Sequence, residues 1–98
     1  MNAMNKVGVF KIKDSFQITG RGLVALGHLI EGTVKVGQRI SLQVDGQIFL
    51  LKISGVEFGK PKENQEPFLG LRISNDNPSL NINLKNVKLQ EQEAELFD

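Results

Sequence analysis

The sequence predicts an all-β protein, a small closed antiparallel β-barrel of about six strands. Apolar and polar residues alternate with a period of two in several short segments, and no sustained helical period is present. Turn-forming residues separate these segments, and 98 residues fit a single domain without a linker. A closed barrel also removes the exposed strand edges that invite aggregation.

The first two strands are predicted from their apolar residues. Phe10 and Ile12 alternate with lysines in a strand over residues 6–13. A second strand over 23–30 has apolar residues on both faces. Such a strand is covered on both sides or bends at its glycine, Gly27.

A tight hairpin is predicted in the middle of the chain. Residues 40–44 alternate apolar and polar side chains, and residues 48–58 form the next β-like segment. Asp45 and Gly46 stand between them. An Asp-Gly pair between two strands favours a two-residue turn, because both central residues take positive φ.

The last third of the sequence is divided by polar segments. Residues 60–67 contain a proline near each end and read as a surface loop, which leads to a strand over 68–73. Residues 74–79 read as a turn, and residues 80–89 as one or two final strands. The remaining segment, 90–98, reads as a helical turn or as disorder.

These elements place the barrel at residues 6–89, with a flexible N-terminus at 1–5 and an acidic tail at 90–98. Residues 1–89 carry twelve Lys/Arg and seven Asp/Glu, a formal charge of +5, whereas the tail has a charge of −4. Two interpretations of the tail remain open. It is a solvated, frayed terminus, or it competes with an anionic partner for the basic body.

Several classes of protein are excluded by composition. There is no cysteine, which rules out disulfides, thiolate metal sites and a cysteine nucleophile. The longest apolar run, 23–30, is far shorter than the roughly 20 residues of a membrane helix. The N-terminus has no signal-peptide features, so we expect a cytoplasmic protein that does not bind membranes. Met1 and Met4 are alternative natural starts, the second leaving residues 1–3 as an addition for expression.

Residues 10–27 carry a recognisable pattern. Asp14 is followed by Phe16, then by Gly20-Arg21-Gly22 and a β-like run ending in Gly27. This pattern resembles the opening of domain 2, a β-barrel, in elongation factor Tu and related translation-factor GTPases. The resemblance extends over residues 6–73 and includes three later segments: 31–40, 53–57 and, more loosely, 68–73.

The resemblance implies a partner-binding surface. In elongation factor Tu this region helps to form the pocket for the aminoacylated end of transfer RNA, and in related factors the domain contacts the ribosome or proteins. By analogy the candidate partner-binding residues are Lys13, Asp14, Phe16, Gly20, Arg21 and Gly22. Lys13 stands where elongation factor Tu has a second acidic residue.

The same residues also have purely structural interpretations. Asp14 can cap a turn by accepting backbone N–H bonds, and Phe16 can plug one end of the barrel. Gly20 and Gly22 suit a tight connection, and Arg21 is equally suited to a phosphate contact or to a bracing ion pair.

No catalytic pattern is present. The Gly-x-x-x-x-Gly-Lys-Ser/Thr loop of GTPases is missing, and the single histidine, His28, has no ligand or triad pattern around it. We therefore expect no enzyme activity, no nucleotide, no metal and no cofactor. The sequence predicts a stand-alone, translation-related binding module for a protein or for RNA, including the ribosome. The alternative is an obligate homodimer or structural subunit that covers the strand at 23–30.

Overall fold

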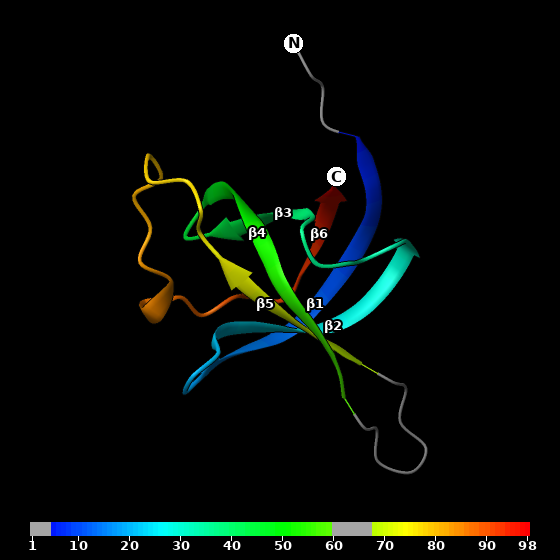
Figure 1. The fold of residues 1–98 in the computed structure, drawn as a ribbon, viewed down its shortest axis with the longest axis horizontal. Helices are drawn as coiled ribbons and strands as arrows, with labels where there is room; N and C mark the ends of the chain where they lie inside the picture. The colour runs from blue at the N-terminus through cyan, green and yellow to red at the C-terminus, as the bar shows by residue number, and fades with distance from the viewer. Residues whose placement is uncertain (1–4, 60–67) are drawn as a thin grey trace.

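The computed structural model describes residues 5–59 and 68–98. Within these residues the chain forms six strands and one short 3₁₀ helix. The predicted loop at 60–67 lies outside the described residues. The elements, shown in Figure 1, are β1 (Lys6–Ile18), β2 (Gly22–Gly32), β3 (Arg39–Val44), β4 (Gln47–Phe58), β5 (Leu69–Ser74), η1 (Leu84–Asn86) and β6 (Gln92–Phe97).

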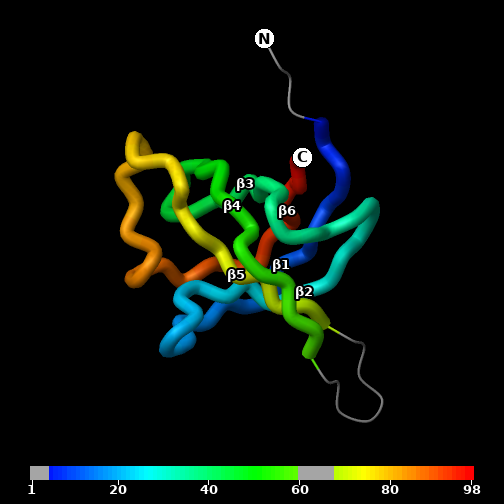
Figure 2. Tube along the Cα trace, in the orientation of Figure 1, coloured from blue at the N-terminus to red at the C-terminus, as the bar shows by residue number. Residues whose placement is uncertain are grey.

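The strands close into a barrel in the order β1-β2-β5-β4-β3-β6, and every pair of neighbours is antiparallel. The predicted fold class is therefore confirmed. The last strand, β6, lies between β1 and β3, which places the end of β6 beside the start of β1 (Figures 1 and 2). The Asp98 N–H donates to the Asn5 carbonyl at 3.1 Å.

The acidic tail is part of the barrel. The prediction of a helical turn or disorder over 90–98 is wrong, because β6 pairs with β1 along its whole length. The carboxylates of residues 90–98 face the lysines of β1: Lys6 Nζ lies 3.2 Å from Glu95 of β6, and Lys11 Nζ lies 3.3 Å from Glu91, which directly precedes β6. Opposite charges across a strand pair favour this pairing. The barrel thus continues through β6 instead of ending at residue 89.

The segment 80–89 crosses one end of the barrel, and the prediction of strands there is wrong. It contains the 3₁₀ helix η1 and forms no strand. Polar side chains of β1 hold it: the Gln17 amide donates to the carbonyls of Leu84 and Val87 at 2.6 and 3.1 Å, and Ser15 Oγ accepts the Leu89 N–H at 2.8 Å. Val87 and Leu89 are buried against the core.

The barrel interior is filled by aliphatic side chains and one phenylalanine. A β-strand points alternate side chains to opposite faces, so every second residue faces inward between bulges. The inward-facing buried residues are Phe10, Ile12, Leu23, Ala25, Ile40, Leu42, Leu51, Ile53, Leu71, Ile73, Ala94 and Leu96. The core is thus built by all six strands.

Both predicted turns in the described part of the chain are confirmed. Asp45 and Gly46 join β3 to β4 with φ of 50° and 82°, as a two-residue hairpin turn requires. In the turn at 74–79, the Asn75 side chain accepts the Asn77 N–H at 3.0 Å. This side-chain bond replaces a backbone bond and ends β5.

The seam between β3 and β6 is closed partly by a side chain. Only Arg39 and Ile40 of β3 pair with β6. Farther along, the Gln92 side chain takes the place of a peptide group: its Oε1 accepts the Gln43 N–H at 2.8 Å, and its Nε2 donates to the Gln43 carbonyl at 3.0 Å. We call this pair of bonds the Gln92 clasp.

Candidate functional site

A β-bulge in β1 decides which of the predicted site residues face outward. Ile12 pairs with Gly27 of β2, and Asp14 pairs with the residue directly before Gly27. Lys13 therefore has no partner in β2 and is an extra residue in β1. The extra residue reverses the alternation of the strand beyond it. Phe16 therefore points outward and is 46% exposed, and the prediction that it plugs the barrel is wrong.

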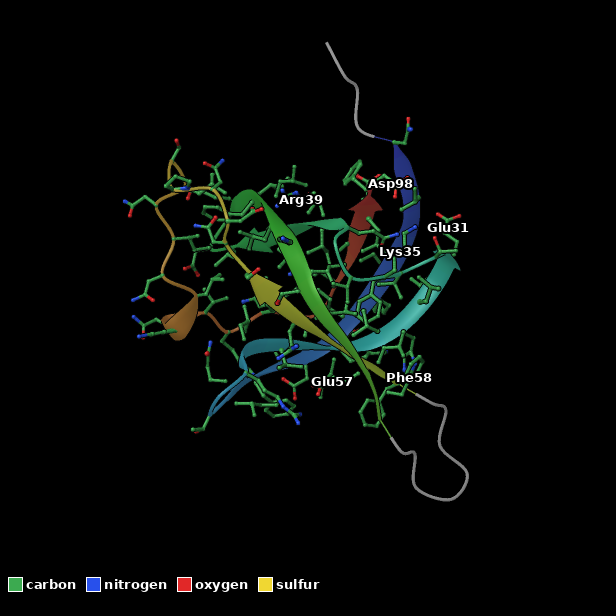
Figure 3. The ribbon with its side chains drawn as sticks, in the orientation of Figure 1. Glu31, Lys35, Arg39, Glu57, Phe58 and Asp98 are labelled. Carbon is green, nitrogen blue, oxygen red and sulfur yellow. The ribbon has the colours of Figure 1, made fainter. Side chains whose placement is uncertain are left out.

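A second bulge has the same effect in β4. Ile53 pairs with Ile73 of β5, whereas Gly55 pairs with the adjacent Arg72, so one residue of β4 is extra. As a result Val56 packs against the core, and Glu57 points outward. Figure 3 shows Glu57 toward the end of the molecule opposite Asp98.

The two bulges frame one outward surface on four adjacent strands. Directly paired residues point to the same side of a sheet, so the register defines two rows across β1, β2, β5 and β4. We call these eight residues the four-strand face: Asp14, Leu26, Gly70 and Glu57 in one row, and Phe16, Val24, Arg72 and Gly55 in the other.

One edge of the four-strand face is held by Lys88. Its ammonium group donates to Asp14 Oδ1 at 2.5 Å and to the Ser15 carbonyl at 2.8 Å, and lies 5.1 Å from the centre of the Phe16 ring. Asp14 also accepts the Ser15 N–H at 2.8 Å, within a strand and not at the turn that the sequence predicted. The bonds from Lys88 and then from Ser15 lower the pKa of Asp14 below its usual value.

The opposite edge is formed by an ion pair. Arg21 Nη1 lies 2.9 Å from one carboxylate oxygen of Glu57 and 3.2 Å from the other. Arg21 stands in the turn between β1 and β2, where Gly20 and Gly22 have φ of 83° and 80°. Glycine adopts such angles without strain, so the predicted role of these two glycines in a tight connection is confirmed.

Arg72 lies between these two edges. Its guanidinium rests on Gly55, where any Cβ would collide with Arg72 Nε and would lie 2.8 Å from Nη2. Next to it, two apolar side chains pack closely against Gly70: a Cβ there would lie 3.2 Å from Val24 Cγ1 and 3.4 Å from Leu26 Cδ2. The face thus combines charged edges with an apolar floor.

The structure brings together most of the candidate residues, but not all. Asp14, Phe16 and Arg21 border one face, whereas Lys13 points away from it, with its Nζ 3.9 Å from Glu91, which directly precedes β6. Four residues of this region were not predicted from the sequence as site residues: Glu57, Lys88, Gly70 and Arg72. Glu57 lies in the segment 53–57, which resembles the translation factors, so the sequence contained a reason to select it. The sequence contained no such reason for Lys88, because it is 74 positions from its partner Asp14.

The chemistry of the four-strand face suits binding. It offers an aromatic ring and guanidinium groups, both of which are enriched in protein interfaces. In the part of the chain that the structure describes, no group of three His, Cys, Asp or Glu side chains is placed to hold a metal ion.

This architecture is that of the second-domain barrel of translation-factor GTPases. The chain is 37% identical over 54 residues to the apicoplast elongation factor Tu of Theileria parva, which covers 55% of this chain and 13% of that protein. It is 38% identical over 77 residues to elongation factor 4 of Geobacillus thermodenitrificans, which covers 79% of this chain and 12% of the relative. The chain is therefore similar to translation elongation factors and has an elongation factor Tu domain 2-like barrel.

The chain spans only about an eighth of the length of these relatives. No protein-family model matches it, and no solved structure matches it significantly. Across residues 5–59 and 68–98, no helix has the length and apolar character needed to cross a membrane.

Proposed function

We propose that the chain is a non-catalytic binding module, related to translation, that binds a protein or RNA partner through the four-strand face. The observation that carries this proposal is the grouping of Asp14, Phe16 and Glu57 on one outer surface, with Arg21 reaching it from the adjoining turn. These residues lie in the segments that resemble the translation factors. Two β-bulges turn them outward, and bulges of this kind commonly re-aim side chains at functional sites.

The exposure of Phe16 supports this role. An aromatic side chain that is 46% exposed beside Lys88 offers a contact for an apolar group or for a base. The surrounding residues are fixed by hydrogen bonds and ion pairs, which reduces the entropy lost on binding. The surface is thus suited to a partner without a large rearrangement.

The alternative, an obligate homodimer that covers the strand at 23–30, has less support. Leu23, Val24 and Ala25 are each at most 2% exposed within the single chain, and Ile30 is 52% exposed. Most of the apolar surface of this strand is thus already covered by the barrel itself. A dimer through β2 would bury little more.

Photocrosslinking tests the proposal. Benzoylphenylalanine replaces Phe16 in one variant and Ile48, which is 74% exposed at the far end of β4, in a control variant. After irradiation in a lysate of the source cells, we expect adducts from position 16 and not from position 48. Loss of the adduct after nuclease or protease treatment identifies RNA or protein. Equal labelling from both positions, or none from position 16, would contradict the proposal, and a crosslinked homodimer would favour the alternative.

A further inference from the structure

The turn between β3 and β4 holds an exposed aspartate directly before an exposed glycine. Asp45 and Gly46 are the two residues of this turn, and a Cβ added to Gly46 would meet no atom within 4 Å. In the part of the chain that the structure describes, no residue bonds the Asp45 carboxylate, and none accepts the Gly46 N–H. The carboxyl carbon and the backbone nitrogen that follows it are thus both accessible and unrestrained.

These two groups can react with each other, because they belong to adjacent residues and their reaction is intramolecular. The Gly46 nitrogen attacks the Asp45 carboxyl carbon and forms a cyclic imide, a succinimide. One carboxyl oxygen leaves as water, with the proton of the nitrogen and one proton from solvent. Water then reopens the ring. Opening at the side-chain carbonyl restores aspartate, whereas opening at the main-chain carbonyl routes the backbone through the side-chain carbon, as isoaspartate.

Two other aspartates of the chain are restrained where Asp45 is not. Asp14 Oδ1 accepts the Ser15 N–H at 2.8 Å, and Ser15 is 1% exposed within β1. The Asp76 carboxylate is bonded by Arg39, and the N–H that follows it, that of Asn77, donates to a side-chain oxygen at 3.0 Å. Neither aspartate precedes a glycine, so a side chain hinders the attacking nitrogen in both. The structure therefore favours ring closure at the turn between β3 and β4.

Isoaspartate at this position lengthens the turn, because it adds one backbone atom between β3 and β4. The length and type of the turn fix the register of a hairpin. Val44 pairs with Gln47 next to the turn, and Gln43 pairs with Ile48. Gln43 is also the residue that the Gln92 clasp holds. The added atom therefore disturbs β3 at the end where only a side chain joins it to β6.

From these observations we propose that Asp45 is a modification site, at which isoaspartate forms spontaneously in the folded protein and loosens the seam between β3 and β6. The net reaction is an isomerisation, since the water released on ring closure is regained on ring opening. The proposal is independent of the proposed function, because no residue of the four-strand face takes part in it.

Ageing of the whole chain in neutral buffer at body temperature tests the proposal. Trypsin releases residues 40–52 as one peptide, in which Asp45 is the only Asp or Asn. We expect a second chromatographic peak of the same mass to grow with time. The endoprotease Asp-N, which cleaves before aspartate and not before isoaspartate, should leave that peak intact. If the folded chain forms no second peak while a synthetic peptide of residues 40–52 does, the turn protects Asp45 and the proposal is overturned.

Two variants separate the chemistry from folding. Asp45→Glu keeps the charge, but its longer side chain closes a larger ring less readily, so the second peak should be lost. Asp45→Asn keeps a favoured hairpin turn and should reach the same isoaspartate through the same ring, with loss of ammonia. Amide hydrogen exchange at residues 41–44 should be faster in the aged natural chain than in the fresh one, and unchanged by ageing of Asp45→Glu. Isoaspartate without faster exchange there would refute the loosening of the seam.

Discussion

Replacing Gln92 by alanine tests how the barrel is closed. The variant removes the clasp, in which one side-chain amide bonds both the N–H and the carbonyl of Gln43. Beyond the two paired residues at the other end of β3, the described structure joins β3 to β6 through this amide. We expect the variant to fold, but with a weaker seam between these strands.

The magnitude follows from the three bonds that are lost, since Gln92 Nε2 also donates to the Gln90 carbonyl at 3.2 Å. Each contributes a net free energy of about 0.5–1.5 kcal/mol, and the lower part of that range applies because the bonds are exposed and water can replace the amide. The free energy of unfolding should therefore fall by about 1.5–3 kcal/mol. For a domain of this size, that loss lowers the melting temperature by roughly 6–24 °C.

A second variant tests the geometry of the clasp. In Gln92→Glu, one oxygen still accepts the Gln43 N–H, but the other faces the Gln43 carbonyl and repels it when ionised. The folded state therefore favours the protonated acid, which raises the pKa of the new carboxyl above its unfolded value of about 4.3. Protons then bind the folded state more tightly, so stability relative to the natural chain should fall as pH rises through this range and recover below it.

The assays are thermal unfolding by circular dichroism and amide hydrogen exchange. Exchange should accelerate at residues 41–44 of β3 in Gln92→Ala, and less at the centre of β1, which keeps both neighbours. Gln90→Ala is the control, because its exposed side chain makes no bond among the described residues. If Gln92→Ala and Gln90→Ala melt at the same temperature, the clasp does not stabilise the seam and the reasoning is wrong.

Two further predictions concern the first strand. The Asp14 carboxyl should titrate below about 3.9 by carbon NMR, and Lys88→Met should raise its pKa toward that value, because Lys88 is the main cause of the shift. The stability from this contact is present above the unfolded pKa and should be lost as pH falls through the folded one; a titration unchanged by Lys88→Met would disprove this cause. Phe10→Ala should cost about 3–5 kcal/mol in denaturant unfolding, whereas Phe16→Ala should cost far less, because Phe10 is fully buried and Phe16 is not. Equal losses would show that Phe16 is part of the core.

The parts of the fold that were predictable depend on local chemistry. The Asp45-Gly46 turn follows from the φ angles that these residues adopt, and neighbouring side chains suffice to identify it. The apolar alternation of β3 and the first half of β1 is likewise a local pattern. Predictions from such local patterns were correct because the tertiary contacts of the barrel favour the same conformations.

The last strand was missed because its signal is distributed over the chain. Ala94 and Leu96 are its only buried residues, and the acidic side chains that alternate with them, Glu93 and Glu95, look like a solvated terminus. Their lysine partners are in the first strand, almost a full chain length away. Pairing between the two ends of a sequence cannot be deduced from either end alone.

The covering segment at 80–89 was mistaken for a strand for a related reason. Its apolar residues alternate because an extended segment lying across the barrel end also buries one side. A strand needs a neighbouring edge to pair with, and closure of the six strands leaves none. Alternation therefore indicates one-sided burial and does not by itself indicate a β-ladder.

The segment that contains the candidate site residues was predictable from the sequence. Which of its side chains lie together on the outer surface was not. Asp14 and Phe16 lie an even number of positions after Phe10 and Ile12, so a regular strand would point all four side chains inward. The extra residue at the bulge, Lys13, turns Asp14 and Phe16 outward. The sequence indicates this bulge only indirectly, through the glycine opposite it. At Gly27 a Cβ would collide with the Lys11 carbonyl, so the tight packing beside the bulge requires glycine.

The pairing of β1 with β6 also sets the order of events during synthesis. Lys6 pairs with Phe97, so β1 leaves the ribosome long before β6 and has one edge unpaired until β6 has been made. Contacts between such distant residues are entropically costly to form, and they slow folding. The barrel therefore closes only after β6 has emerged, and in the interval the unpaired edge of β1 is a place where a chaperone or a neighbouring nascent chain can pair.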